Sequence, residues 1–147
     1  MKSAIAALCL TLLPLAAGAE VVKVPASADV PETMDALVAA VKGAGATVFA
    51  RVDHAKGAEG IGEDLQPAQL LIFGNPKLGT PAMQDDIQAG LLLPLRVLVY
   101  EDAGKVWLAY EDPAEMLTAL DGVGPEAGYL PVMAGALAKL TAKAAGQ

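Results

Sequence analysis

The residue best suited to chemistry in this chain is His54, the only histidine in the sequence. It ends the alternating segment TVFARVDH, residues 47–54, and precedes a glycine-rich stretch, so a rigid strand end would hold the imidazole beside an accessible loop. An imidazole in that place could bind a metal ion or act as a general base. Asp53 points to the opposite face of the strand, so the two residues are not a ready-made dyad. The structural alternative is a buried neutral ring satisfied by one backbone hydrogen bond.

Two short segments offer side chains that could join His54. In FGNP, residues 73–76, Asn75 suits the N-cap of a following helix, and a ligand contact is the alternative role. In GTPAMQDD, residues 79–86, Met83 with His54 would suit copper, whereas Asp85 and Asp86 with His54 would suit harder ions. The chain has no histidine pair and no Met-x-Met cluster, so helix packing for Met83 and a solvated helix face for the aspartates are favoured. No metal or cofactor is assigned.

A covalent nucleophile has little support. Beyond residue 19 the only serine is Ser27, and the single cysteine of the chain is Cys9. The threonines, Thr80 among them, are ordinary structural residues on this evidence. No GxSxG, GxGxxG or P-loop motif is present, and no spacing selects a pair of carboxylates for acid–base work. The sequence leans away from an enzyme without excluding one.

The periodicity of apolar residues predicts the elements that would position these side chains. The expected strands are residues 20–27, 47–54, 68–74, 93–100 and 105–110. The expected helices are residues 30–46, 112–122 and 125–146. The first helix would bury a stripe of Met34, Leu37, Val38 and Val41, and the last would bury Leu130, Met133, Leu137 and Leu140. The run AQLLIFG, residues 68–74, is typical of a central strand that is covered on both faces. Because Gly79 and Pro81 interrupt the next segment, only a loop and a short helix near Ala82–Ala89 are expected there.

The order of these elements indicates the fold class. A hairpin is expected where EDAG, residues 101–104, joins two alternating segments late in the chain. This order favours an α+β fold with a mixed, mainly antiparallel sheet of about five strands and helices packed on one face.

The N-terminus has the layout of a secretory signal peptide. Lys2 precedes the apolar stretch Ala4–Ala17, and small residues at 17–19 come before Glu20. We therefore expect residues 1–19 to be removed on export to the periplasm or the medium. Residues 20–147 would then form a single domain with an alanine-rich C-terminal helix and no span through a membrane.

The charge of the chain argues against one class of partner. The formal net charge is −7, and binding to nucleic acid requires lysine and arginine clusters that this sequence lacks. Nucleic acid is therefore not an expected partner, and the acidic surface is typical of a soluble protein.

Three stretches together resemble the DUF302 family, a domain of unknown function. They are ETMDALVAAVKGAGATVFARVDHAKGA, LQPAQLLIFGNPKLGTPAM and LLLPLRVLVYEDAGKVWLAYEDP, and the likeness runs from about Ser27 to Leu120. The resemblance implies a compact α+β fold that pairs as a homodimer. It also implies that His54, Asn75 and the turn Gly79–Met83 share one cleft. It supplies no reaction, substrate or cofactor.

These observations favour an exported, dimeric binding protein whose cleft takes a small ligand or a metal. The residues expected to contact the ligand are His54, Asn75, Thr80 and Met83. One alternative keeps the cleft and makes His54 the general base of an enzyme. The other is an interaction module in which the hairpin RVLVYEDAGKVWLAY, residues 96–110, presents an exposed edge for pairing with a partner.

Overall fold

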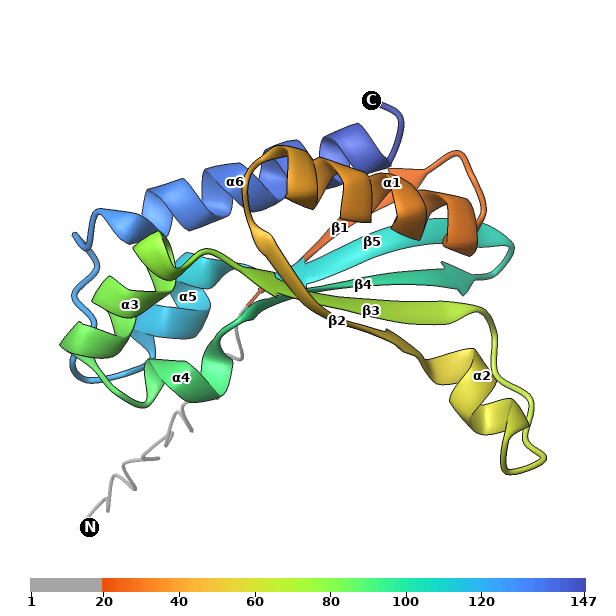
Figure 1. The fold of residues 1–147 in the computed structure, drawn as a ribbon, viewed down its shortest axis with the longest axis horizontal. Helices are drawn as coiled ribbons and strands as arrows, with labels where there is room; N and C mark the ends of the chain where they lie inside the picture. Colours follow the sequence, from red (N-terminus) through yellow and green to blue (C-terminus); the bar gives the residue numbers. More distant parts are fainter. Residues whose placement is uncertain (1–19) are drawn as a thin grey trace, which may run out of the picture.

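A computed structural model describes residues 20–147 of the chain (Figure 1). The predicted signal peptide and Cys9 lie outside the described residues. The elements in chain order are β1 Val21–Ala26, α1 Val30–Gly43, β2 Thr47–Asp53, α2 His54–Glu59, β3 Ala68–Gly74, α3 Pro76–Asp85, α4 Ala89–Leu92, β4 Leu95–Asp102, β5 Lys105–Glu111, α5 Pro113–Thr118 and α6 Tyr129–Ala144. None of these helices is long and apolar enough to cross a membrane.

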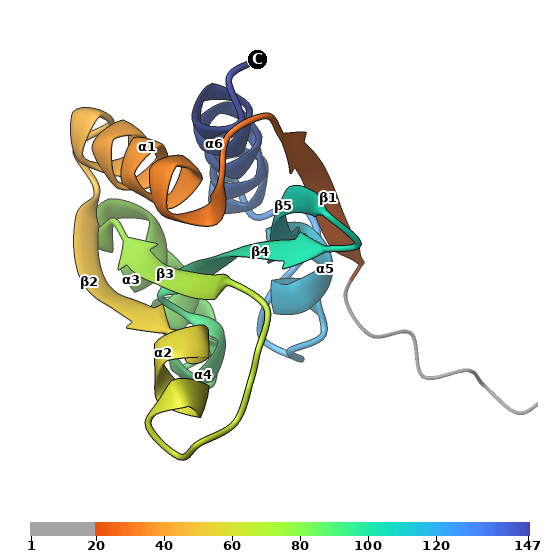
Figure 2. The same ribbon diagram turned by 90° about the vertical axis from the view of Figure 1, so that its right-hand side faces the viewer.

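The five strands form one sheet in the order β1-β5-β4-β3-β2, and every neighbouring pair is antiparallel. Helices α1 and α6 lie side by side over one face of this sheet (Figures 1 and 2). Helix α2 lies beyond one end of the sheet, and α3, α4 and α5 gather at the other end (Figure 1). The predicted α+β class, with about five strands and helices packed against the sheet, is confirmed, and the sheet is wholly antiparallel where a mixed one was expected.

The core lies between the sheet and the two long helices. The predicted helical stripes are largely confirmed, because α1 buries Met34, Leu37 and Val41 completely and α6 buries all four of its predicted residues. The strands meet them with fully buried Leu71, Val97, Val99 and Leu108. Each fully buried aliphatic side chain contributes about 1.5–3 kcal/mol to folding. Burial of these residues therefore holds α1 and α6 against the sheet.

The hairpin of β4 and β5 is confirmed, but its predicted role as an exposed edge is wrong. Ala103 and Gly104 have φ of 49° and 74°, as a two-residue turn between twisted strands requires. Strand β5 is flanked by β1, and β4 is flanked by β3, so neither strand has free backbone groups to offer. The edges of the sheet are β1 and β2.

Three further expectations need correction. Strand β3 lies inside the sheet, between β4 and β2, but the two long helices α1 and α6 cover only one of its faces (Figure 2). Helix α3 runs through Gly79 and Pro81, because Asn75 caps its first turn and the fully buried Ala82 anchors it after the proline. The glycine-rich segment after β2, where no helix was expected, forms α2 because Asp53 caps it by accepting a hydrogen bond from the Lys56 amide at 3.0 Å.

Candidate functional site

A pocket of about 300 Å³ opens where β3 ends and β4 begins, beside helix α3. Its polar lining side chains are Asn75 and Thr80, whereas Met83, Met133 and the aromatic ring of Phe49 supply much of the apolar lining. The remaining lining residues are glycines, prolines and leucines, and no charged side chain lines the pocket. This composition is typical of a site for a small, mostly apolar molecule.

Three glycines, Gly74, Gly79 and Gly90, line this pocket. A Cβ atom on Gly90 would lie 3.0 Å from Cε of Met83, and one on Gly74 would lie 3.4 Å from Cβ of Pro94. A Cβ on Gly79, which lies in α3, would lie 3.7 Å from Cδ1 of Leu93. At all three positions an added Cβ would contact another residue of the pocket lining.

Three of the four predicted ligand contacts meet in this pocket. Asn75 stands at its rim as the N-cap of α3, where its Oδ1 accepts a hydrogen bond from the Lys77 amide at 3.0 Å. Thr80 and Met83 follow on the same helix, and Met83 is 38% exposed. The capping role predicted for Asn75 is confirmed, and a ligand contact by any of the three stays a prediction.

The expectation that His54 shares this cleft is wrong. In the antiparallel pair of β2 and β3, Thr47 lies opposite Gly74 and Asp53 lies opposite Gln69. His54 follows Asp53 and Asn75 follows Gly74, so the two lie at opposite ends of the sheet, about 20 Å apart at 3.3 Å per residue. His54 is an exposed first residue of α2 and not a strand residue.

Phe49 is the pocket residue that the sequence interpretation missed. The register between β2 and β3 shifts between Val48 and Ala50, and this bulge turns Phe49 out so that it is 57% exposed. Antiparallel pairing of β2 with β3 is the signal that could have identified it. In such a pair, the first residues of β2 lie opposite the last residues of β3. Phe49, near the start of β2, is therefore next to Gly74.

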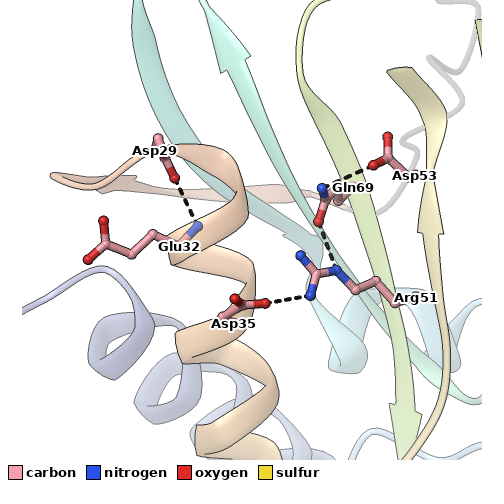
Figure 3. Close-up of polar contacts among 6 residues, drawn as sticks. All are labelled: Asp29, Glu32, Asp35, Arg51, Asp53 and Gln69. Atoms are coloured by element: carbon pink, nitrogen blue, oxygen red, sulfur yellow. Dashed lines mark hydrogen bonds and ion pairs between the residues drawn. The ribbon is translucent and has the colours of Figure 1, made fainter. Parts of the chain in front are cut away.

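The opposite end of the sheet carries a polar network (Figure 3). Nε of Arg51 donates to Oε1 of Gln69 at 2.8 Å, and Nε2 of Gln69 donates to Oδ2 of Asp53 at 3.2 Å. The guanidinium also pairs with Asp35 of α1. Gln69 is only 8% exposed, and its amide links strands β2 and β3 to the cap of α2. Since these groups satisfy one another, the network ties four elements together.

The aspartates considered as metal ligands make contacts within the chain. Oδ2 of Asp85 accepts the hydroxyl of Tyr129 at 2.8 Å, and Asp86 accepts the amides of Gln88 at 2.9 Å and Gly122 at 3.2 Å. Partial burial, together with the hydrogen bond and negative charge of Asp85, raises the pKa of Tyr129 to about 12. Within residues 20–147, no group of three or more acidic, histidine or cysteine side chains could hold a metal ion. His54 is far from both aspartates in the fold, so the metal set combining it with them does not form.

Comparison with known proteins supports the fold and connects the chain to larger proteins. A crystal structure of an uncharacterised conserved DUF302 protein from Bacillus stearothermophilus superposes with a TM-score of 0.76 at 20% identity, over 84% of this chain and 97% of the other. A protein of Brucella suis named "Fluoride-specific ion channel FluC 1" is 51% identical over 86 residues, which are 58% of this chain and 34% of that protein. Its Brucella abortus namesake matches equally well over 32% of its length. The match thus spans about a third of these curated relatives.

The family assignment follows from the extent of the match. The family described as "Domain of unknown function DUF302" matches residues 22–144. This range contains every helix and strand of the fold apart from Val21, the first residue of β1. The three stretches that carry the family resemblance fall within that range. This chain belongs to the DUF302 family.

Proposed function

We propose that this DUF302 protein binds a small, neutral, largely apolar molecule in the pocket beside α3, and that it does so as an exported homodimer. The observation that carries the proposal is the pocket itself, whose lining has two amide or hydroxyl side chains and no charge. A buried charge on the ligand would lack a partner there and would be costly. The ligand is therefore uncharged where it enters the pocket.

Volume and lining restrict the ligand further. An apolar cavity of about 150 Å³ is large enough for benzene, so about 300 Å³ accommodates a molecule of roughly two rings. The thioethers of Met83 and Met133 and the ring of Phe49 make favourable contacts with aromatic groups. Asn75 and Thr80 would orient a single polar group at the rim.

The position of His54 favours binding over catalysis at this site. A general base must come within about 3 Å of the proton it removes, and His54 lies at the other end of the sheet. Export rests on the signal-like pattern before Glu20, and self-association rests on the family resemblance.

The direct test uses 1-aminonaphthalene, a fluorescent probe of two rings that is neutral at pH 7. The substitution Gly79→Leu places an aliphatic side chain in the pocket, and we expect it to weaken probe binding at least tenfold in a fluorescence titration. Gly57→Leu is the matched control, because Gly57 is also helical but has nothing within 4 Å of its Cβ position. Both this control and His54→Ala should bind the probe like the unaltered protein. Equal binding by Gly79→Leu, or no binding by any form, would contradict the proposal.

A second candidate function is that of an accessory module beside a membrane channel. It is favoured by the 51% identity over 86 residues to proteins named as fluoride-specific ion channels. Comparing thermal melts in sodium fluoride and sodium chloride at equal ionic strength tests direct fluoride binding. A fluoride-specific rise in the melting temperature would support this candidate.

A further inference from the structure

Neither α1 nor α6 covers the second face of the sheet, and α2, α4 and α5 lie on that side only towards the ends of the strands (Figures 1 and 2). The strand register fixes which side chains this face presents. We call it the outer face. Side chains on directly paired residues share a face, so the outer face consists of three rows. The rows are Val21, Glu111, Arg96, Ile72 and Ala50; then Lys23, Ala109, Leu98, Leu70 and Val52; then Pro25, Trp107, Tyr100 and Ala68.

The outer face is more apolar than a wetted sheet face should be. An antiparallel sheet that faces water alternates apolar residues inside with polar residues outside. The outward side chains of β3 are instead Ala68, Leu70 and Ile72, with no polar group among them. Next to them lie Leu98 and Val52, and Val52 is 38% exposed. The centre of this face therefore lacks an apolar partner in the described chain.

The arrangement of the outer face matches a protein interface. Apolar side chains occupy the middle of the second row, and the aromatic rings of Trp107 and Tyr100 lie beside them. A shallow hollow of about 430 Å³ lies between Val21, Leu70 and Leu98. Protein interfaces combine an apolar centre with aromatic anchors and a polar rim in this manner.

The free edges of the sheet do not offer an alternative way of pairing. On β2 the bulge at Phe49 interrupts the row of backbone groups. On β1, Pro25 has no amide to donate, and its carbonyl already accepts Nε2 of Gln147 at 3.1 Å. Pairing through the edges is therefore disfavoured, and of the two faces of the sheet α1 and α6 already cover one.

The charge distribution identifies a second copy as the occupant. The chain carries a net charge of −7, so most surfaces of two copies repel each other. The outward side chains of the sheet include three cations, Lys23, Arg96 and Lys105, against two anions, Asp102 and Glu111. Arg96 and Glu111 pair at 3.1 Å and are 42% and 46% exposed. A second copy can approach this near-neutral face and meet it with opposite charges.

The size of the outer face is sufficient for a modest dimer. Five strands spaced about 4.8 Å apart and about 20 Å long present roughly 500 Å² per copy, or about 1,000 Å² in total, near the lower limit of specific interfaces. A contact of this size predicts a dimer that dissociates on dilution.

We infer that two copies of this chain pack outer face to outer face about a two-fold axis. Such an interface is isologous, so each copy contributes the same residues, and Arg96 of one copy can meet Glu111 of the other. The inference rests on the self-association included in the proposed function and names the surface that makes it.

Sedimentation equilibrium of the chain beginning at Glu20 tests this surface with a matched pair of valines. Val52→Asp introduces a carboxylate on the outer face, whereas Val132→Asp does so on α6, where the side chain is 52% exposed. We expect a dimer for the unaltered protein and for Val132→Asp, and a monomer for Val52→Asp. A monomer for the unaltered protein at 100 µM, or a dimer for Val52→Asp, would overturn the inference.

The single tryptophan gives an independent readout. Trp107 lies on the outer face, so acrylamide should quench its fluorescence more strongly as the unaltered protein is diluted. Val52→Asp should show the strongly quenched state at every concentration. Quenching of the unaltered protein that does not change with dilution would also overturn the inference. Because the probe titration reads the pocket separately, a monomer that still binds probe refutes this interface and leaves ligand binding intact.

Discussion

The two ends of the sheet divide between them the features that a functional site usually combines. The α3 end has an open volume lined by Asn75, Thr80 and Met83 but has no titratable group in that lining. The α2 end has the histidine, together with Arg51 and Asp53. The side chains of Arg51, Gln69 and Asp53 are bonded to one another there. The contrast shows that reactive residue types and accessible space are separate properties of a fold, and that a binding site needs the space first.

The largest expected effect contrasts glycines at the two ends. A Cβ on Gly122 would lie 2.5 Å from the carbonyl oxygen of Asp85, so Gly122→Ala must displace the turn behind the pocket. We expect a loss of about 2 kcal/mol in the free energy of unfolding, as for other overpacked sites. Gly57→Ala at the α2 end should instead stabilise the protein by about 0.5–1 kcal/mol, because its helix has room for a methyl group. Urea denaturation measures both, and equal effects would remove the distinction.

A smaller effect is expected from the polar network. Gln69→Leu keeps the volume of a nearly buried side chain but leaves Nε of Arg51 and Oδ2 of Asp53 without their partner. The expected loss is about 1 kcal/mol. Asp35→Asn removes only the exposed ion pair with Arg51 and should change stability by less than about 0.5 kcal/mol. If Gln69→Leu were as stable as the unaltered protein, the network would not hold the α2 end together.

The smallest effect is a titration behind the pocket. Absorbance at 295 nm should show Tyr129 ionising near pH 12, and Asp85→Asn should bring its pKa back towards 10.0. Asp86→Asn is the control, because Asp86 contacts Gly122 and not the phenol. Since the folded pKa is raised, the stabilisation is complete below pH 10 and is lost as the pH rises through about 12. A Tyr129 signal near pH 10 in the unaltered protein would mean that the contact does not form.

Local patterns in the sequence predicted most of the fold. The stripes on α1 and α6 and the hairpin of β4 and β5 depend on period and turn residues alone, and all were found. The interruption expected at Gly79 and Pro81 was wrong because burial of Ala82 outweighs local propensity. The interior place expected for β3 was found, but the cover expected on both of its faces was not, because a run of apolar residues does not specify which element buries each side chain.

The candidate site was predicted in part, and the missing part has a physical cause. Asn75, Thr80 and Met83 are close in sequence and lie on one helix or at its cap, so they reach one pocket together. His54 and Phe49 depend on the pairing of β2 with β3, which exchanges the ends of the two strands. Pairing direction therefore decided which aromatic side chain borders the cavity.

The three glycines that border the cavity have a consequence for related proteins. Gly74, Gly79 and Gly90 line the pocket without projecting a side chain into it. None of the three has the positive φ that would disfavour another residue. The capacity of the recess can thus be changed one methyl group at a time without rebuilding the backbone. DUF302 chains that differ at these positions should accommodate guests of different length on the same scaffold.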